Sequence, residues 1–202
     1  MSDETTGRPA ERPAERPAGR PTTAPQTFSP AWADAAGRAD PPLVGDEREV
    51  LLSYLEFHRE TFALKCAGVP TGRLSEFLVP PSGLTLHGLV RHLAGVEQWW
   101  LQIQFAGDES RPVLYYSDDD PDQDFERLDG DFDEAFATWR AQVEISRRII
   151  ADTPSLDATG VHKATGQPVS LRRILVHMLA EYARHNGHAD LLRERIDGAT
   201  GY

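Results

Sequence analysis

Three ionisable side chains near the C-terminus, Glu181, His185 and His188, lie in the segment EYARHNGHADLLRERIDGATG. In a helix, Glu181 and His185 stand one turn apart, separated by roughly 40° around the axis and about 6 Å along it. Their side chains can therefore converge on one metal ion. The same spacing also fits a hydrogen bond between a glutamate and a histidine in an ordinary core, and spacing alone leaves both interpretations open.

The helix that carries these residues has a single apolar stripe. The stripe consists of Leu171, Ile174, Leu175, Met178, Tyr182, Ala189, Leu192 and Ile196. His185 falls inside the stripe and Glu181 at its border, whereas His177 is turned further away and is expected to face solvent. A carboxylate at a core position is costly unless it is paired, protonated or bound to a cation. The pattern therefore requires a partner from elsewhere in the chain.

A second helix, predicted from about Thr85 to Phe105, also mixes core and ionisable residues. Its buried stripe consists of Leu89, Val90, Leu93, Val96, Trp100 and Ile103. His92 lies at the margin of this stripe and Glu97 within the buried arc. Buried polar groups on two helices of one bundle suggest a shared site. Taken alone, His92 is better explained as a histidine at the core edge; taken with Glu181 and His185, it is the candidate third ligand.

The elements that must position these residues are four helices. They are predicted at about 46–67, 85–105, 131–151 and 170–196, bounded by capping residues, glycines and prolines. No long alternating strand pattern appears, although a short extended piece fits residues 160–169. The predicted fold is therefore all-α, a four-helix bundle with a long acidic connection between the second and third helices.

The acidic connection, residues 117–133, is dense in Asp and Glu. We tested it as a calcium-binding loop. With Asp118 as the first ligand, Gln123 occupies the position where the sharp turn needs glycine; with Asp120 as the first ligand, Phe125 occupies it. The pattern fails in both registers, and a solvated acidic loop is the better interpretation.

Composition divides the chain into two parts. Residues 1–42 are rich in Pro, Arg, Glu and Ala and cannot bury enough surface to fold, so they are predicted to form a disordered tail. Residues 43–202 form the predicted domain. No apolar run approaches the length of a membrane span, the tail has no apolar segment of signal-peptide length, and the single cysteine, Cys66, suits a reducing compartment. We expect a cytoplasmic protein that does not bind membranes.

The formal net charge of −11 argues against a nucleic-acid partner, because such binding depends chiefly on neutralising phosphates. Trp99, Trp100 and Trp139 are candidates for the surface of a homodimer if they are exposed. Trp99 is also on the His92 side of its helix, where it could form the wall of a pocket.

The strings TLHGLVRHLAGVEQWW and SLRRILVHMLAEYARHNGHADLLRERIDGATG, with the acidic insert between them, resemble the DinB-like superfamily of four-helix metal proteins, in an actinobacterial branch. The resemblance covers roughly residues 46–201. It implies that His92, Glu181 and His185 hold a divalent metal, with His188 as a supporting group or an alternative ligand. On the last helix of the superfamily the ligand pair is either His-x-x-x-His or Glu-x-x-x-His. The second form, which Glu181 and His185 have, resembles the mycothiol-dependent maleylpyruvate isomerases more than the members with three histidines.

The resemblance also implies a function. Zinc is the first choice of metal, with nickel, iron and manganese as alternatives, and mycothiol is the expected co-substrate. Two histidines and one carboxylate leave coordination positions open, as a catalytic site needs. The expected activity is transfer of the thiol to a small electrophile, or thiol-dependent isomerisation. A metal-dependent hydrolase and a non-catalytic metal or small-molecule binding module are the alternatives, and recruitment of His188 as a fourth ligand would favour the latter.

Overall fold

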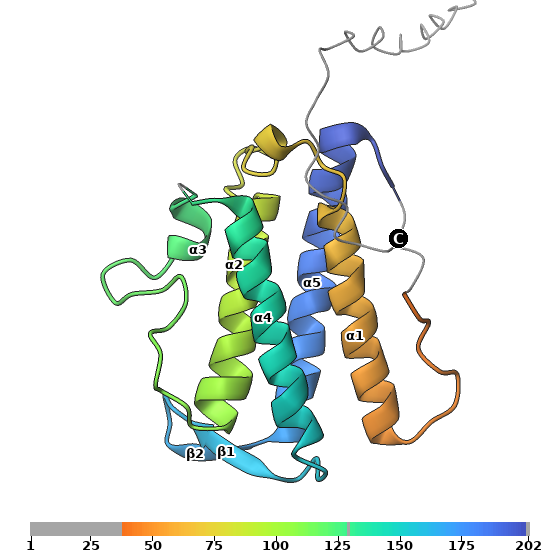
Figure 1. Cartoon of the computed structure of the whole chain (residues 1–202), viewed down its shortest axis with the longest axis vertical. Helices are drawn as coiled ribbons and strands as arrows, with labels where there is room; N and C mark the ends of the chain where they lie inside the picture. The colour runs from red at the N-terminus through yellow and green to blue at the C-terminus, as the bar shows by residue number, and fades with distance from the viewer. Residues whose placement is uncertain (1–37, 129, 201–202) are drawn as a thin grey trace, which may run out of the picture.

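Four long helices form a bundle (Figure 1) in the structure, a computed structural model that describes residues 38–128 and 130–200. They are α1 (Glu47–Cys66), α2 (Leu86–Glu97) with its continuation η3 (Gln98–Phe105), α4 (Phe132–Ala151) and α5 (Leu171–Asp197). α1 packs against α5, and α2 packs against α4. Because α2 and α4 run in the same direction (Figure 1), the chain between η3 and α4 crosses back along the bundle. The predicted all-α four-helix fold is confirmed.

Each long helix begins at a polar side chain that caps its first turn. Asp46, Thr85, Asp131 and Ser170 each accept a hydrogen bond from a backbone N–H two or three residues later. Such a bond satisfies a donor that the start of a helix otherwise leaves unpaired. At the other end of α5, Gly198 has a φ of 81°, in the left-handed region that glycine adopts at little cost. The caps explain why the predicted helix boundaries agree with the observed ones within one residue.

The shorter elements are less visible in the sequence. η3 is a π-helix that continues α2 without a break. The crossing connection contains a short helix, α3 (Gln123–Glu126). The extended piece predicted at residues 160–169 is an antiparallel hairpin of β1 (Thr159–His162) and β2 (Gln167–Ser170). A Cβ atom at Gly160 would lie 2.4 Å from Cα of Phe105, so only glycine lets the hairpin cover the end of η3.

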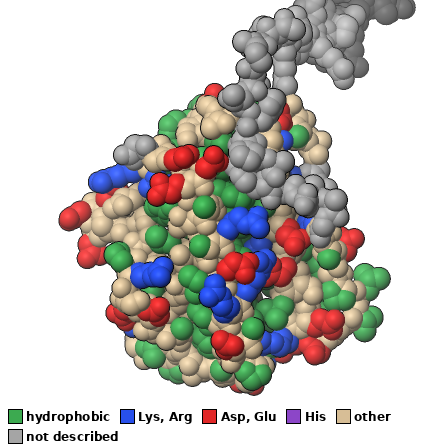
Figure 2. Space-filling model, in the orientation of Figure 1, with side chains coloured by type: hydrophobic (Ala, Val, Ile, Leu, Met, Phe, Trp, Pro, Cys, Tyr) green, Lys and Arg blue, Asp and Glu red, His purple; other side chains and the backbone are tan. Residues whose placement is uncertain are grey.

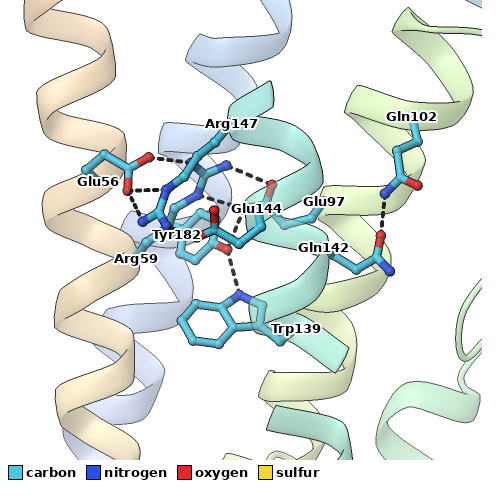
Figure 3. A network of polar contacts seen from close by, with 9 residues as sticks. All are labelled: Glu56, Arg59, Glu97, Gln102, Trp139, Gln142, Glu144, Arg147 and Tyr182. Atoms are coloured by element: carbon cyan, nitrogen blue, oxygen red, sulfur yellow. Dashed lines mark hydrogen bonds and ion pairs between the residues drawn. The ribbon is translucent and has the colours of Figure 1, made fainter. Parts of the chain in front are cut away.

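A buried polar network joins all four helices inside the apolar core (Figure 3). Arg59 of α1 donates two hydrogen bonds, each 2.8 Å long, to the carboxylate of Glu97 at the end of α2. The hydroxyl of Tyr182 on α5 donates to Glu97 at 2.7 Å and accepts from the indole of Trp139 on α4 at 2.8 Å. Burial, together with the charge of Glu97, raises the pKa of Tyr182, which keeps this donor protonated. The buried charge predicted at Glu97 is thus paired.

At the surface, ion pairs continue this network toward solvent. Glu56 accepts hydrogen bonds from both Arg59 and Arg147, and Arg147 also contacts Glu144 (Figure 3). On the face that Figure 2 shows, Lys and Arg side chains are interspersed with Asp and Glu. A basic area of the kind that nucleic-acid binding requires is not seen on this face.

The structure bears on the predicted tail, on the proposed dimer surface and on membrane-spanning helices. Of the predicted tail, residues 1–37 lie outside the described residues, and Arg38 beyond them donates a 2.8 Å hydrogen bond to Thr61 of α1. Trp139 is buried in the core, so it does not contribute to a dimer surface. Among the helices of residues 38–128 and 130–200, none combines the length and the apolar content needed to cross a membrane.

Candidate metal centre and its cavity

The three side chains expected to hold a metal meet between α2 and α5. One ligand atom from each of His92, Glu181 and His185 lies within 4.8 Å of the others. Oε2 of Glu181 is 3.7 Å from Nε2 of His92 and 3.4 Å from Nε2 of His185. Ligand atoms about 2.0 Å from a tetrahedral ion are about 3.3 Å apart. The two distances from Glu181 are therefore close to the spacing of ligand atoms in a coordination shell.

His92 is oriented by a carboxylate from the crossing connection. Its Nδ1 lies 2.8 Å from Oδ2 of Asp124, which belongs to α3. A neutral histidine that donates from Nδ1 presents the lone pair of Nε2 on the opposite side of the ring. Here Nε2 points toward Glu181 and is buried without a hydrogen-bond partner among the described residues. A buried nitrogen of this kind calls for an explanation, and a cation between His92 and Glu181 would supply one.

The charges within the cluster also fit a cation. Burial opposes protonation of His92, but Asp124 and Glu181 outweigh it and raise the pKa of His92 to about 9. Contacts with His185 first and then with His92 hold the pKa of Glu181 well below its usual range. Glu181 is therefore ionised at neutral pH, and without a metal its charge is balanced by a proton on His92. A divalent ion would take the place of that proton.

His188 lies behind His185 rather than in the cluster. Its Nδ1 is 3.3 Å from Nδ1 of His185, on the opposite edge of the imidazole from the nitrogen that faces Glu181. His188 is also absent from the group of ligand atoms that lie within 4.8 Å of one another. Of the two roles expected for His188, this position fits support of His185.

The expectation that His177 faces solvent was wrong. Its Nε2 lies 3.5 Å from Oε1 of Glu181, and its ring centroid is 4.3 Å from that of Trp100. The side chain is only partly exposed, because η3 packs across this part of α5 and places Trp100 over it. The periodicity of α5 alone could not reveal this contact, because Trp100 belongs to another helix.

A cavity of about 610 Å³ opens beside His92. One wall is a stripe along α2 and η3 that includes Val96, Trp99 and Trp100, so Trp99 lines a pocket as the sequence suggested. The other wall is formed by residues 113–124 of the crossing connection. Since His92 and Asp124 both belong to the lining, the cavity reaches the candidate metal centre.

The crossing connection is fixed to α2 and η3 by side chains. Gln98 is buried, donates to the carbonyl of Pro112 at 3.0 Å and accepts from the N–H of Leu114 at 2.8 Å. Arg91 donates to the carbonyls of Gln123 and Arg127. The prediction of a solvated acidic loop was thus only partly right, because the segment forms the cavity wall and supplies Asp124.

Asp124 is a residue of the candidate site that the sequence pattern did not reveal. A signal was available, since histidine ligands of metals usually donate their second N–H to a carboxylate or a carbonyl. The acidic segment offers many carboxylates, however, and nothing in its pattern distinguishes Asp124 from its neighbours.

Comparison with known protein families identifies a match for most of the chain. No curated protein and no solved structure matches the chain. The sequence model of the family described as mycothiol-S-transferase matches residues 50–198, which include His92, Asp124, Glu181 and His185. The match extends over well more than half of the chain and contains all four long helices, apart from the first turn of α1. The chain therefore belongs to the mycothiol-S-transferase family, within the DinB-like superfamily.

Proposed function

We propose that this chain is a divalent-metal-dependent enzyme that activates a low-molecular-weight thiol of the mycothiol type and transfers it to a small electrophile. The observation that carries the proposal is the cluster of His92, Glu181 and His185, of which His92 also lines a cavity of about 610 Å³. Membership of the mycothiol-S-transferase family supports the choice of thiol and of reaction.

His92, Glu181 and His185 would hold the ion through two imidazole nitrogens and one carboxylate oxygen. Zinc is the first choice for this set, with nickel, iron and manganese as alternatives. A divalent ion in this position lowers the pKa of a bound thiol and so makes a thiolate available near neutral pH. Three protein ligands leave room for that thiol, and the position of His188 behind His185 supports an open site.

The residues of the chain have separate tasks in this proposal. Asp124 keeps Nε2 of His92 directed at the centre. The aromatic walls of the cavity would offer an electrophile an apolar surface beside His92. Cys66 does not provide the nucleophile, because it is fully buried and burial raises the pKa of its thiol. The reacting sulfur therefore comes from the small thiol.

The first test is the metal content of full-length protein purified without added metal. Wild-type protein should retain close to one equivalent, and both His92→Ala and Glu181→Ala should lose it. His162→Ala is the matched control, since His162 bonds to Thr165 in the hairpin and is outside the cluster. Stoichiometric metal in both cluster variants would overturn the site.

The second test concerns the thiol. Mycothiol should raise the melting temperature of the metal-loaded protein more than an analogue that lacks the sulfur, because a ligand of the folded state stabilises it. Formation of a thioether from mycothiol and an electrophile, followed by mass spectrometry, then tests transfer. Ester or amide hydrolysis without thiol would favour the hydrolase alternative, and metal binding without either reaction would favour a binding module.

A further inference from the structure

The cavity beside the candidate metal centre has four large aromatic side chains in its walls. Trp99 and Trp100 line it from η3, and Tyr115 and Tyr116 line it from the crossing connection. Aromatic side chains on two sides offer faces and edges to a planar ring between them. Val96 adds aliphatic surface close to His92. The walls are therefore suited to an apolar, planar molecule.

The ionisable groups of the cavity give it a negative character. Apart from the tyrosines, they are His92, Asp124 and Asp118, and no lysine or arginine is part of the lining formed by the described residues. Arg91 lies nearby, 4.5 Å from the ring centroid of Tyr115, but its guanidinium is directed to two backbone carbonyls. When the proposed ion takes the place of the proton on His92, the carboxylate of an incoming molecule would find no cationic side chain in the walls formed by the described residues.

A carboxylate-bearing acceptor would therefore be penalised twice. It would lose hydration on entering an apolar cavity, and it would approach Asp118 and the carboxylates around His92. In the proposed complex the charges of Glu181 and the thiolate would balance the divalent ion, so the carboxylates of Asp118 and Asp124 in the lining would remain to repel an anion. An uncharged acceptor avoids both costs and gains the contact with the aromatic walls.

The cavity is also preformed, because the segment of the crossing connection that makes one wall is held in place by hydrogen bonds. Gln98 fixes the backbone at Pro112 and Leu114 on one side. Tyr115 has a φ of 52°, a left-handed conformation that a bulky residue adopts only when its surroundings hold it there. The volume of about 610 Å³ is in the usual range for small-molecule sites.

We propose that this cavity selects uncharged aromatic electrophiles as thiol acceptors and rejects anionic ones, an inference that rests on the proposed thiol transfer. In a substitution of this kind, the thiolate sulfur forms a bond to the electrophilic carbon. The leaving group departs with the bonding electron pair, and the thiol proton passes to solvent. The reaction consumes no oxidant or reductant.

The test uses two benzylic bromides that differ in charge: methyl 4-(bromomethyl)benzoate and 4-(bromomethyl)benzoate. Metal-loaded, full-length protein and mycothiol are supplied with each, and kcat/KM is divided by the uncatalysed rate constant of the same bromide. The ester should be preferred by about tenfold or more. Asp118→Asn should reduce the preference, and Trp99→Leu should lower kcat/KM for the ester. Asp119→Asn, in the same segment but outside the lining, should leave the preference unchanged.

Binding of unreactive analogues separates this inference from the proposed function. Methyl 4-methylbenzoate and 4-methylbenzoate are titrated without thiol, with the fluorescence of the cavity tryptophans as the signal, in wild-type protein and Asp118→Asn. Tighter binding of the ester without any thioether formation would contradict the transfer reaction and uphold the selectivity. Equal or tighter binding of the carboxylate, or its faster conversion, would overturn the selectivity even if transfer is found.

Discussion

Asp124 shapes the candidate centre although it is not one of the three proposed ligands. Its carboxylate holds His92 through Nδ1. Replacing Asp124 with Asn should weaken metal affinity by about 10- to 100-fold, because the histidine loses its orientation and part of its basicity. Competition with a chromophoric chelator measures the change. Asp119→Asn removes an exposed carboxylate of the same segment and is the control; an equal loss there would mean that only the charge of the segment matters.

Metal affinity should also depend on pH. The pKa of His92 is raised to about 9, so at neutral pH a proton occupies the nitrogen that the metal needs. Apparent affinity should therefore rise by about tenfold per pH unit up to about pH 9, with one proton released per ion bound. In the metal-free protein, by contrast, a rise in pH should lower the folding stability. The stability contributed by protonated His92 is complete below the pKa of the histidine in the unfolded chain and is lost as the pH passes 9.

Calorimetry in two buffers of different ionisation enthalpy counts the released proton. In Asp124→Asn the pKa of His92 should be lower. The metal affinity should therefore stop increasing at a lower pH than in the wild-type protein. An affinity that does not change between pH 7 and pH 9 would show that no proton competes with the metal.

The sequence placed His92, Glu181 and His185 at one candidate site, where the structure brings them together, and it missed Asp124 for a physical reason. Glu181 and His185 are on one helix, whose period fixes their relative position. His92 could be placed because the apolar stripe of its own helix must face the core. Asp124 reaches His92 only through the path of the crossing connection, and that path depends on contacts such as those of Gln98 that no local pattern reveals.

Whole elements also differ in whether a local sequence pattern reveals them. The four long helices were predicted well because their caps are local signals. The π-helical turns of η3 have no such signal, since they keep the apolar character of α2 and change only the hydrogen-bond partners. α3 is a single turn in an acidic segment, and it packs on α2 where Gly88 leaves space for Phe125.

Gly88 allows a direct test of the packing between α2 and α3. A Cβ atom there would lie 2.9 Å from Cδ1 of Phe125. Gly88→Ala should therefore lower the free energy of unfolding by about 1 kcal/mol or more, despite the better helix propensity of alanine. It should also weaken metal binding, because Asp124 precedes Phe125. Urea denaturation and chelator competition measure the two effects.

Gly187 of α5 is the matched control, because a Cβ atom there would meet no atom within 4 Å. Gly187→Ala should raise the free energy of unfolding by about 0.5–1 kcal/mol through helix propensity alone. If Gly88→Ala stabilises the protein as Gly187→Ala does, α3 does not pack closely on α2.

At the scale of the whole molecule, the buried pair of Arg59 and Glu97 joins α1 to α2 inside the bundle (Figure 3). Glu97→Gln removes one charge and leaves the buried Arg59 with only the partly exposed Glu56 as a counterion, which should cost on the order of 3 kcal/mol of unfolding free energy. Glu144→Gln removes a half-exposed partner of Arg147 and should change stability by about 0.5 kcal/mol at most. Thermal and urea unfolding compare the two variants; similar losses would mean that the buried pair contributes no more than a surface one.

The position of the crossing connection has a consequence for engineering the protein. The proposed ligands belong to the bundle, whereas one wall of the cavity is a segment fixed at its two ends by Gln98 and Arg91. Residues 115–121 between these anchors can be exchanged or randomised without altering a long helix or a ligand. A library confined to them, with Asp124 retained, should change which molecules enter the cavity while the four long helices and the proposed ligands keep their sequence, so the contents of the cavity and the folding of the bundle can be evolved as separate traits.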